Sequence, residues 1–133
     1  MKCNYDNVVV GSSFEAVLFA FVNRYPILYT NHTAPFRFSY IPATVDLSSI
    51  KLQNTPSIVK TLDDEIIVGT PKSLLWERML FLLSLDSKAP LSNLCTSLRR
   101  VDNKIVCSNE YSKIAEVNFT ECHYFYDKNA SNF

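Results

Sequence analysis

The chain has 133 residues, with 13 basic and 13 acidic side chains and a formal net charge of zero at pH 7. This length fits a single domain, and 47% apolar with 13% aromatic residues suffice for a packed core, which excludes wholesale disorder. The balanced charge gives no basic footprint for nucleic acid or an anionic membrane, so we expect neither partner.

The N-terminal segment lacks the features of a secretory signal. Asp6 precedes the first apolar run, and that run breaks at Gly11, short of the roughly 7–15 apolar residues that a signal peptide needs. No window of the sequence approaches the roughly 20 apolar residues that span a bilayer. We therefore expect a cytoplasmic protein that does not enter a membrane.

The N-terminal part of the chain predicts a strand, a helix and a second strand. Val8–Val10 is a β-branched run that ends at Gly11, which is typical of a strand buried in a parallel sheet. Ser12 and Ser13 offer hydroxyl groups for an N-cap. Apolar residues then recur at helical spacing at Phe14, Val17, Leu18, Phe21 and Val22. Because Tyr25–Tyr29 is a second β-rich run, this part has about the size of a βαβ unit.

Residues 31–62 predict an irregular excursion over the surface. Pro35, Pro42 and Pro56 interrupt this stretch, and only Phe36–Ile41 has the composition of a strand. A segment of this length without regular structure is typical of a functional loop or of a loop that depends on a partner.

A second helix is predicted after the strand Glu65–Val68. Thr70 is expected as its N-cap and Pro71 as its first residue. From Leu74 to Leu85 the helix is apolar nearly all round, so we expect it to be buried on several sides or to face another chain. This favours an oligomer.

The C-terminal third predicts a three-stranded antiparallel meander over residues 94–119. Asp102-Asn103 is a turn signal, because both residues tolerate positive φ. The predicted strands are Leu94–Val101, Lys104–Ser108 and Tyr111–Phe119. Cys122–Tyr126 reads as one more strand, which we expect to return elsewhere in the sheet.

The four cysteines do not form the close pair that is typical of a structural zinc site. Cys95 and Cys107 can face each other across the predicted hairpin, which would permit a disulfide geometrically. We favour four thiols that behave as small buried hydrophobic groups. No metal site is therefore expected.

Two other groups of polar residues are weaker candidates for a catalytic or metal-binding site. His32 and His123 form no Ser-His-Asp or Cys-His arrangement in sequence order, and we interpret both as surface or core-edge residues. The acidic run Asp63–Glu65 is interpreted as a solvated turn, because metal binding needs oxygen ligands that converge from a loop. The catalytic residues therefore remain unassigned.

The chemistry is expected at the segment Gly11-Ser12-Ser13-Phe14-Glu15-Ala16, where the first strand meets the first helix. This reads G-x-S-x-x-A against the dinucleotide fingerprint G-x-G-x-x-G/A. Gly11 permits the sharp turn, and Ala16 is small enough for close packing of helix and strand. Ser13 stands where a pyrophosphate would approach the helix N-terminus, so its side chain would either bind phosphate or obstruct it. Asn31, after the second strand, can hydrogen-bond a ribose hydroxyl.

The segment Tyr5–Ala16 resembles the opening of the two-dinucleotide-binding-domain flavoproteins, among them the UDP-galactopyranose mutases and amine-oxidase-like enzymes. In that family a three-stranded meander is followed by a short strand that returns to the parallel sheet, and Arg99–Phe119 with His123–Tyr126 are similar in order and length. The resemblance implies an α/β fold: a Rossmann-like FAD/NAD(P)-binding βαβ sheet with a three-stranded antiparallel meander, formed by residues 1–133 as a single domain. It also implies FAD pyrophosphate at Gly11, Ser12 and Ser13, with Phe14 and Ala16 beside it, and adenosine ribose near Asn31.

The sequence departs from that family at three points. Ser13 replaces the second glycine, Asn31 replaces the ribose-binding acid, and the substrate domain is absent. Because family members are roughly two to three times as long, the chain would be a fragment, a reduced relative or one partner of a split protein.

Two hypotheses for function follow. The first is an FAD-binding domain of oxidoreductase or mutase type, with NAD(P) as the second choice of cofactor; the residues leave open whether it is active alone. It would need a missing partner domain or form a homo-oligomer. The alternative is a non-enzymatic, Rossmann-like interaction module that forms an oligomer and binds no nucleotide.

Overall fold

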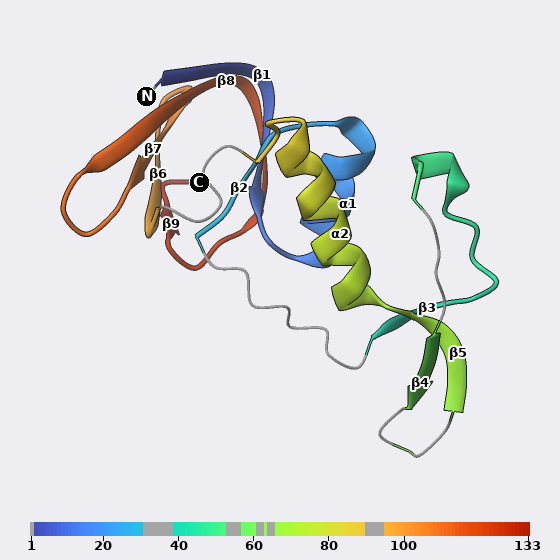
Figure 1. Ribbon diagram of the computed structural model, residues 1–133. Coiled ribbons are helices and arrows are strands. Elements are labelled where there is room, and N and C mark those ends of the chain that lie inside the picture. The colour runs from blue at the N-terminus through green and yellow to red at the C-terminus, as the bar shows by residue number, and fades with distance from the viewer. Residues whose placement is uncertain (1, 31–38, 53–56, 61–62, 64–65, 90–94) are drawn as a thin grey trace.

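The computed structural model in Figure 1 describes residues 2–30, 39–52, 57–60, 63, 66–89 and 95–133. Within these residues the chain is an α/β protein with a six-stranded mixed sheet, a three-stranded antiparallel sheet and two α-helices. The elements are β1 (Lys2–Gly11), α1 (Phe14–Asn23), β2 (Ile27–Leu28), β3 (Tyr40–Pro42), the 3-10 helix η1 (Ser48–Ile50), β4 (Ser57–Lys60), β5 (Ile66–Pro71), α2 (Lys72–Leu85), β6 (Ser97–Val101), β7 (Lys104–Ser108), β8 (Lys113–Tyr126) and β9 (Ala130–Ser131). No helix among the described residues is long and apolar enough to cross a membrane.

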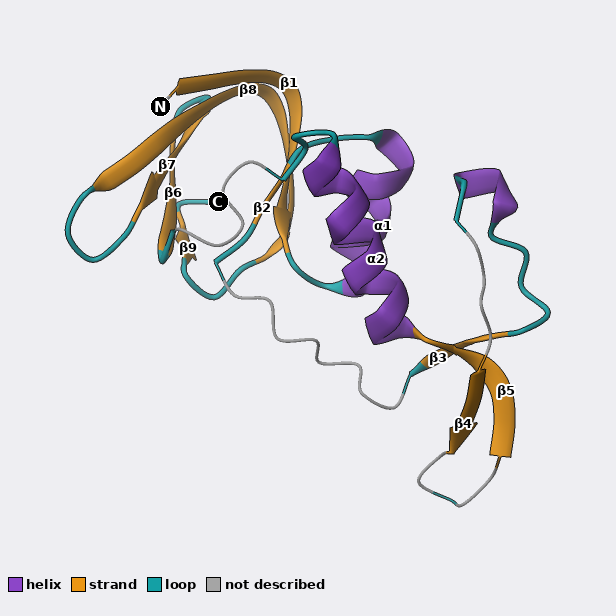
Figure 2. Ribbon diagram, viewed as in Figure 1, coloured by secondary structure: helices purple, strands orange, loops and turns teal. Residues whose placement is uncertain are grey.

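The larger sheet has the strand order β2-β1-β8-β7-β6-β9 and curls on itself (Figure 1). The smaller sheet, β3-β5-β4, projects beyond the N-terminal end of α2 (Figure 2). β1 lies between two parallel neighbours, since Val9 pairs with Ile27 of β2 and with His123 of β8. The predicted strand, helix and parallel strand are therefore confirmed for β1, α1 and β2.

The expected meander does not exist as a separate unit. β7 pairs antiparallel with β6 on one side and with β8 on the other, so all three strands belong to the six-stranded sheet. The separate strand expected at Cys122–Tyr126 is wrong, because β8 continues from Lys113 to Tyr126 without a break. β8 pairs antiparallel with β7 over residues 113–118 and parallel with β1 over residues 116–126, so residues 116–118 have both neighbours. A single long strand therefore joins the antiparallel and parallel parts.

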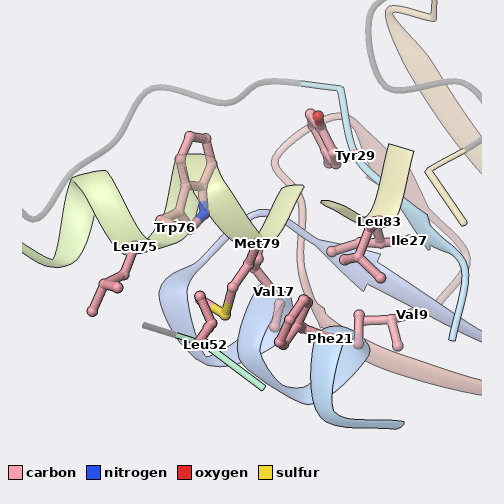
Figure 3. Close-up of a cluster of buried hydrophobic side chains, with 12 residues drawn as sticks. Val9, Val17, Phe21, Ile27, Tyr29, Leu52, Leu75, Trp76, Met79 and Leu83 are labelled. Carbon is pink, nitrogen blue, oxygen red and sulfur yellow. The ribbon is translucent and has the colours of Figure 1, made fainter. Parts of the chain in front are cut away.

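Two hydrophobic clusters lie on opposite faces of β1. Val9 packs with α1 and α2, whose side chains fill the cluster in Figure 3. Val8 and Val10 point into the second cluster, inside the curl of the sheet. All three valines are fully buried, which explains the continuous apolar run of the strand, because polar alternation requires a solvent-facing side.

The second helix begins later than the sequence predicted. Thr70 and Pro71 are the last residues of β5, and α2 begins at Lys72 with no side-chain cap. Thr70 cannot serve as the N-cap because it pairs with Ile41 of β3 in the smaller sheet. One face of α2 packs against α1, whereas Phe81 and Leu85 are 61% and 65% exposed. The helix is thus buried on one side and leaves apolar side chains on another.

The stretch 31–62 is not irregular throughout. Its described parts contain β3, η1 and β4, and the two strands flank β5 on either side. Leu52 in this stretch is buried against α2 (Figure 3). Residues 31–38, 53–56 and 61–62 lie outside the described residues.

Gly11→Ala is expected to destabilise the fold by about 3 kcal/mol. A Cβ atom there would lie 2.9 Å from the Tyr126 carbonyl oxygen and 3.0 Å from the Phe125 Cβ, at a backbone φ of +137° that side chains rarely adopt. The free energy of unfolding in urea measures the loss. Asn4→Ala, at an exposed position of the same strand, is the control and should change stability by no more than about 0.5 kcal/mol. Similar small losses from both variants would contradict the close approach of β8 to Gly11.

Candidate functional site

The candidate site lies at the carboxyl edge of three parallel strands. β2, β1 and β8 run in the same direction, so the residues that follow them meet at one edge, where open α/β sheets bind their ligands. The bend from Gly11 to Phe14 joins β1 to the N-terminus of α1 at this edge. The structure thus brings together four of the six predicted residues in one short segment, with Ala16 one turn further into the helix.

Gly11 provides the bend, but the end of β8 lies next to it, where a ligand would otherwise be expected. Its pairing with Tyr126 follows an irregularity in the register of β1 with β8. Tyr126 itself has a φ of 126°, which is unusual for a residue with a side chain. The absence of a Cβ at Gly11 therefore lets the end of β8 approach, and a ligand would contact the residues that follow Gly11 rather than Gly11 itself.

Ser13 caps the first helix. Its Oγ accepts a hydrogen bond of 3.1 Å from the Ala16 amide, and its carbonyl accepts one of 3.0 Å from the Val17 amide. The Ser13 backbone has the extended conformation that is usual for an N-cap residue. The N-cap that the sequence offered at Ser12 and Ser13 is therefore confirmed at Ser13. The same hydroxyl was also predicted either to bind phosphate or to obstruct it, and as the cap it holds the first turn of α1 in place.

The bend is also held from the side by α2. The Trp76 Nε1 group donates a hydrogen bond of 2.7 Å to the Ser12 carbonyl, and the Trp76 ring is almost fully buried. Phe14 lies half-buried at the start of α1, with the Lys72 ammonium 5.1 Å from its ring centroid. Ala16 is fully buried, which fits its predicted role in close helix–strand packing. The bend is therefore rigid, and a cationic side chain stands beside it.

The second strand ends next to a carboxylate that sequence reasoning missed. The Thr30 amide donates a hydrogen bond of 2.7 Å to Asp127 Oδ2, and the Thr30 hydroxyl donates one of 2.5 Å to Asp127 Oδ1. The Asn129 amide donates to the same Oδ1 at 2.9 Å, and the Asn129 side-chain amide donates to the Thr30 hydroxyl oxygen at 3.0 Å. Asp127 is only 6% exposed. This network joins the residue after β2 to the residues after β8.

Asn31, the predicted ribose ligand, lies outside the described residues. After the predicted second strand the sequence has no acid at the expected position and offers only this amide. The acid at this edge is instead Asp127, which comes from the segment after β8. Its signal in the sequence was its position directly after a strand, but only the parallel pairing of β8 with β1 places it beside Thr30.

The remaining polar candidates do not form a catalytic group among the described residues. His123 stacks on the Tyr25 ring, with centroids 5.6 Å apart, and its Nε2 lies 3.0 Å from Asn7 Oδ1. This agrees with a core-edge role. His32 lies outside the described residues, as do two residues of the acidic run, and Asp63 is exposed. Within the described residues no three His, Cys, Asp or Glu side chains are arranged to hold a metal ion.

No known protein family, no curated protein and no solved structure matches this chain.

Replacing Ser13 should destabilise α1, and by more with alanine than with glycine. Ser13→Ala is expected to cost about 1 kcal/mol, and Ser13→Gly about 0.3 kcal/mol, because glycine is a better N-cap than alanine. The Ala16 amide loses its acceptor in both variants. Urea unfolding measures the two losses. Ser84→Ala, at an exposed position of α2, is the control. An alanine variant as stable as the wild type would show that the hydroxyl does not cap α1.

Removing Asp127 should destabilise the fold at the carboxyl edge of the larger sheet. Asp127→Ala is expected to cost about 3 kcal/mol, because two amides and the Thr30 hydroxyl lose their acceptor. Combined with Thr30→Val in a double-mutant cycle, it should give a coupling free energy of about 1 kcal/mol or more. Asp6→Ala, which removes an exposed carboxylate, controls for the change in net charge. Additive losses in the cycle would contradict a direct interaction between the two side chains.

Proposed function

We propose that this chain is a Rossmann-like dinucleotide-binding domain that takes FAD, with NAD(P) as the second choice. The observation that carries the proposal is the glycine bend between the buried parallel strand β1 and the N-terminus of α1, at the edge where β2 and β8 also end. Strand, bend and helix in this order are the frame on which dinucleotide pyrophosphates bind. The resemblance of Tyr5–Ala16 to flavoprotein openings agrees with this choice of cofactor.

The residues around the bend suit an anion. The N-terminus of α1 carries partial positive charge, and Ser12, Ser13 and Phe14 are only partly buried, so their surfaces remain accessible. Lys72 adds a full positive charge close to Phe14. Glu15 opposes an anion, but its side chain is exposed and its charge is therefore screened. The pyrophosphate would lie against these residues.

The Asp127 network suits the other end of the cofactor. Asp127 fixes the Thr30 amide and hydroxyl, two residues after the end of β2. The adenosine ribose is proposed to lie near the next residue, Asn31. When bound, FAD supplies hydride chemistry of the oxidoreductase or mutase type, and this chain supplies the binding and orientation of the cofactor. A partner domain, or a second copy of the chain, would have to cover the flavin ring.

A second candidate is a non-enzymatic interaction module that binds no nucleotide and forms an oligomer. It is favoured by apolar side chains on the surface, because Phe81 and Leu85 of α2 and Ile66 and Val68 of β5 are each more than half exposed. Phe81 and Leu85 lie one turn apart on α2, and exposed apolar side chains that gather on one surface commonly mark an interface. The two candidates differ in one measurable property, namely nucleotide binding.

The test uses two substitutions that keep the helix cap. Aspartate and asparagine both serve as N-caps, so Ser13→Asp and Ser13→Asn should fold with stability close to that of the wild type. Only aspartate places a negative charge where the pyrophosphate is proposed to lie. FAD at 100 times its dissociation constant should stabilise the wild type and Ser13→Asn by about 2.7 kcal/mol, and Ser13→Asp should lose most of this gain. Melting curves with FAD, NAD and ADP, and absorbance near 450 nm after gel filtration, provide the measurements.

Each other outcome counts against a stated part of the proposal. If FAD, NAD and ADP leave the melting temperature unchanged, the proposal that this chain binds a nucleotide is wrong. An oligomer in sedimentation velocity would then support the interaction module. If FAD stabilises all three proteins equally, a nucleotide binds away from the bend. If NAD stabilises the protein and FAD does not, NAD(P) becomes the first choice of cofactor in place of FAD.

A further inference from the structure

Two thiols meet inside the curl of the larger sheet. Cys107 lies in β7 and is fully buried, and Cys95 lies just before β6 and is 6% exposed. The Thr96 amide donates a hydrogen bond of 2.8 Å to the Ser108 carbonyl, which extends the β6–β7 ladder toward Cys95. Both side chains belong to the same buried hydrophobic cluster inside the curl. The hairpin thus places the two thiols in one part of the core, where each affects the pKa of the other more than any other group does.

The two thiols of this pair differ in chemical character. The hydrogen bond from Cys107 lowers the pKa of Cys95 below its ordinary value, although burial and the nearby charge of Asp127 both act to raise it. The same hydrogen bond and burial raise the pKa of Cys107. Of the two thiols only Cys95 has any exposed surface, at 6% against 0% for Cys107. It is therefore the thiol that an external disulfide reaches first.

The other two cysteines, Cys3 and Cys122, are more exposed and pack at the margin of the same cluster. Cys3 lies on β1, where burial and, after it, the nearby Cys3 thiol raise the pKa of Tyr5. Cys122 lies on β8, where burial raises the pKa of its thiol. All four cysteines lie within the described residues and all four are thiols. Cys3 also acts on the pKa of Cys107, but less than Cys95 does, so Cys95 and Cys107 are the most strongly interacting pair of described thiols.

We propose that Cys95 and Cys107 are a site of reversible oxidation, at which a small-molecule disulfide such as oxidised glutathione converts the two thiols into one intramolecular disulfide. The pair lies inside the curl of the sheet, and the proposal stands whether or not a nucleotide binds.

The reaction proceeds in two exchange steps. The Cys95 thiolate attacks one sulfur of the small disulfide, which forms a mixed disulfide and releases the other half as a thiolate. The Cys107 sulfur, after passing its proton to the released thiolate or to water, then attacks the Cys95 sulfur and releases the second half. Two protein thiols and one small disulfide thus give one protein disulfide and two small thiols, so two electrons pass from the protein to the reagent.

The experiment treats the full chain with oxidised glutathione and then counts its thiols under denaturing conditions. The count should fall from four to two, and the mass of the intact chain should fall by that of two hydrogen atoms. Peptide mapping without reduction should recover a cross-linked pair that contains Cys95 and Cys107. The melting temperature should rise on oxidation and return on reduction, because the cross-link restricts the unfolded chain.

Two matched variants separate this pair from the other thiols. Cys122→Ser should still lose two thiols on treatment, because that residue takes no part in the cross-link. Cys95→Ser should form no intramolecular disulfide, and since serine is close to cysteine in size and shape this variant is expected to fold. The proposal is overturned if wild-type protein keeps all four thiols, if it stops at a mixed disulfide with glutathione, or if mapping finds Cys3 or Cys122 in the cross-link.

Discussion

The rest of the structure depends on the contact between the ends of two parallel strands. β1 is the only strand of the larger sheet with parallel neighbours on both sides among the described residues, and residues 8–11 at its end are buried on both faces. At its end the missing Cβ of Gly11 lets the backbone of Tyr126 approach. This contact sets where β1 stops, where α1 begins and where the segment after β8 lies. The bend, the helix N-terminus and the Asp127 network are all positioned by it.

Local parts of the fold could be predicted because their signals lie close together in the sequence. Val8–Val10 have no polar alternation, which indicates burial on both faces, and Ser13 precedes a run with helical periodicity, which indicates an N-cap. The wrong predictions concern pairing partners. Thr70 and Pro71 have the composition of a helix start, but pairing with β3 keeps both residues in β5. A local propensity was overridden by a distant strand, because Ile41, which pairs with Thr70, lies 29 positions earlier in the chain.

The site illustrates the same limit. The residues of the bend are consecutive, so a short motif was enough to identify them. Asp127 belongs to the same edge only because β8 runs parallel to β1, and its partner Thr30 lies 97 positions earlier in the chain. The continuity of β8 was also hidden, since Thr120 and Glu121 are polar residues that suggest a turn but remain in the strand. Their place in the strand follows from pairing with β1, which a single sequence does not reveal.

The dual pairing of β8 has a consequence for the order in which the protein assembles. β1 is synthesised before β8, yet much of its ladder is made with residues 116–126. During synthesis on a ribosome β1 must therefore wait until β8 has emerged before it gains this neighbour. Contacts so distant in sequence close slowly, because the intervening chain must first lose its freedom. The antiparallel hairpin of β6 and β7, whose pairing is local, can form beforehand and present β8 as the template on which β1 completes the sheet.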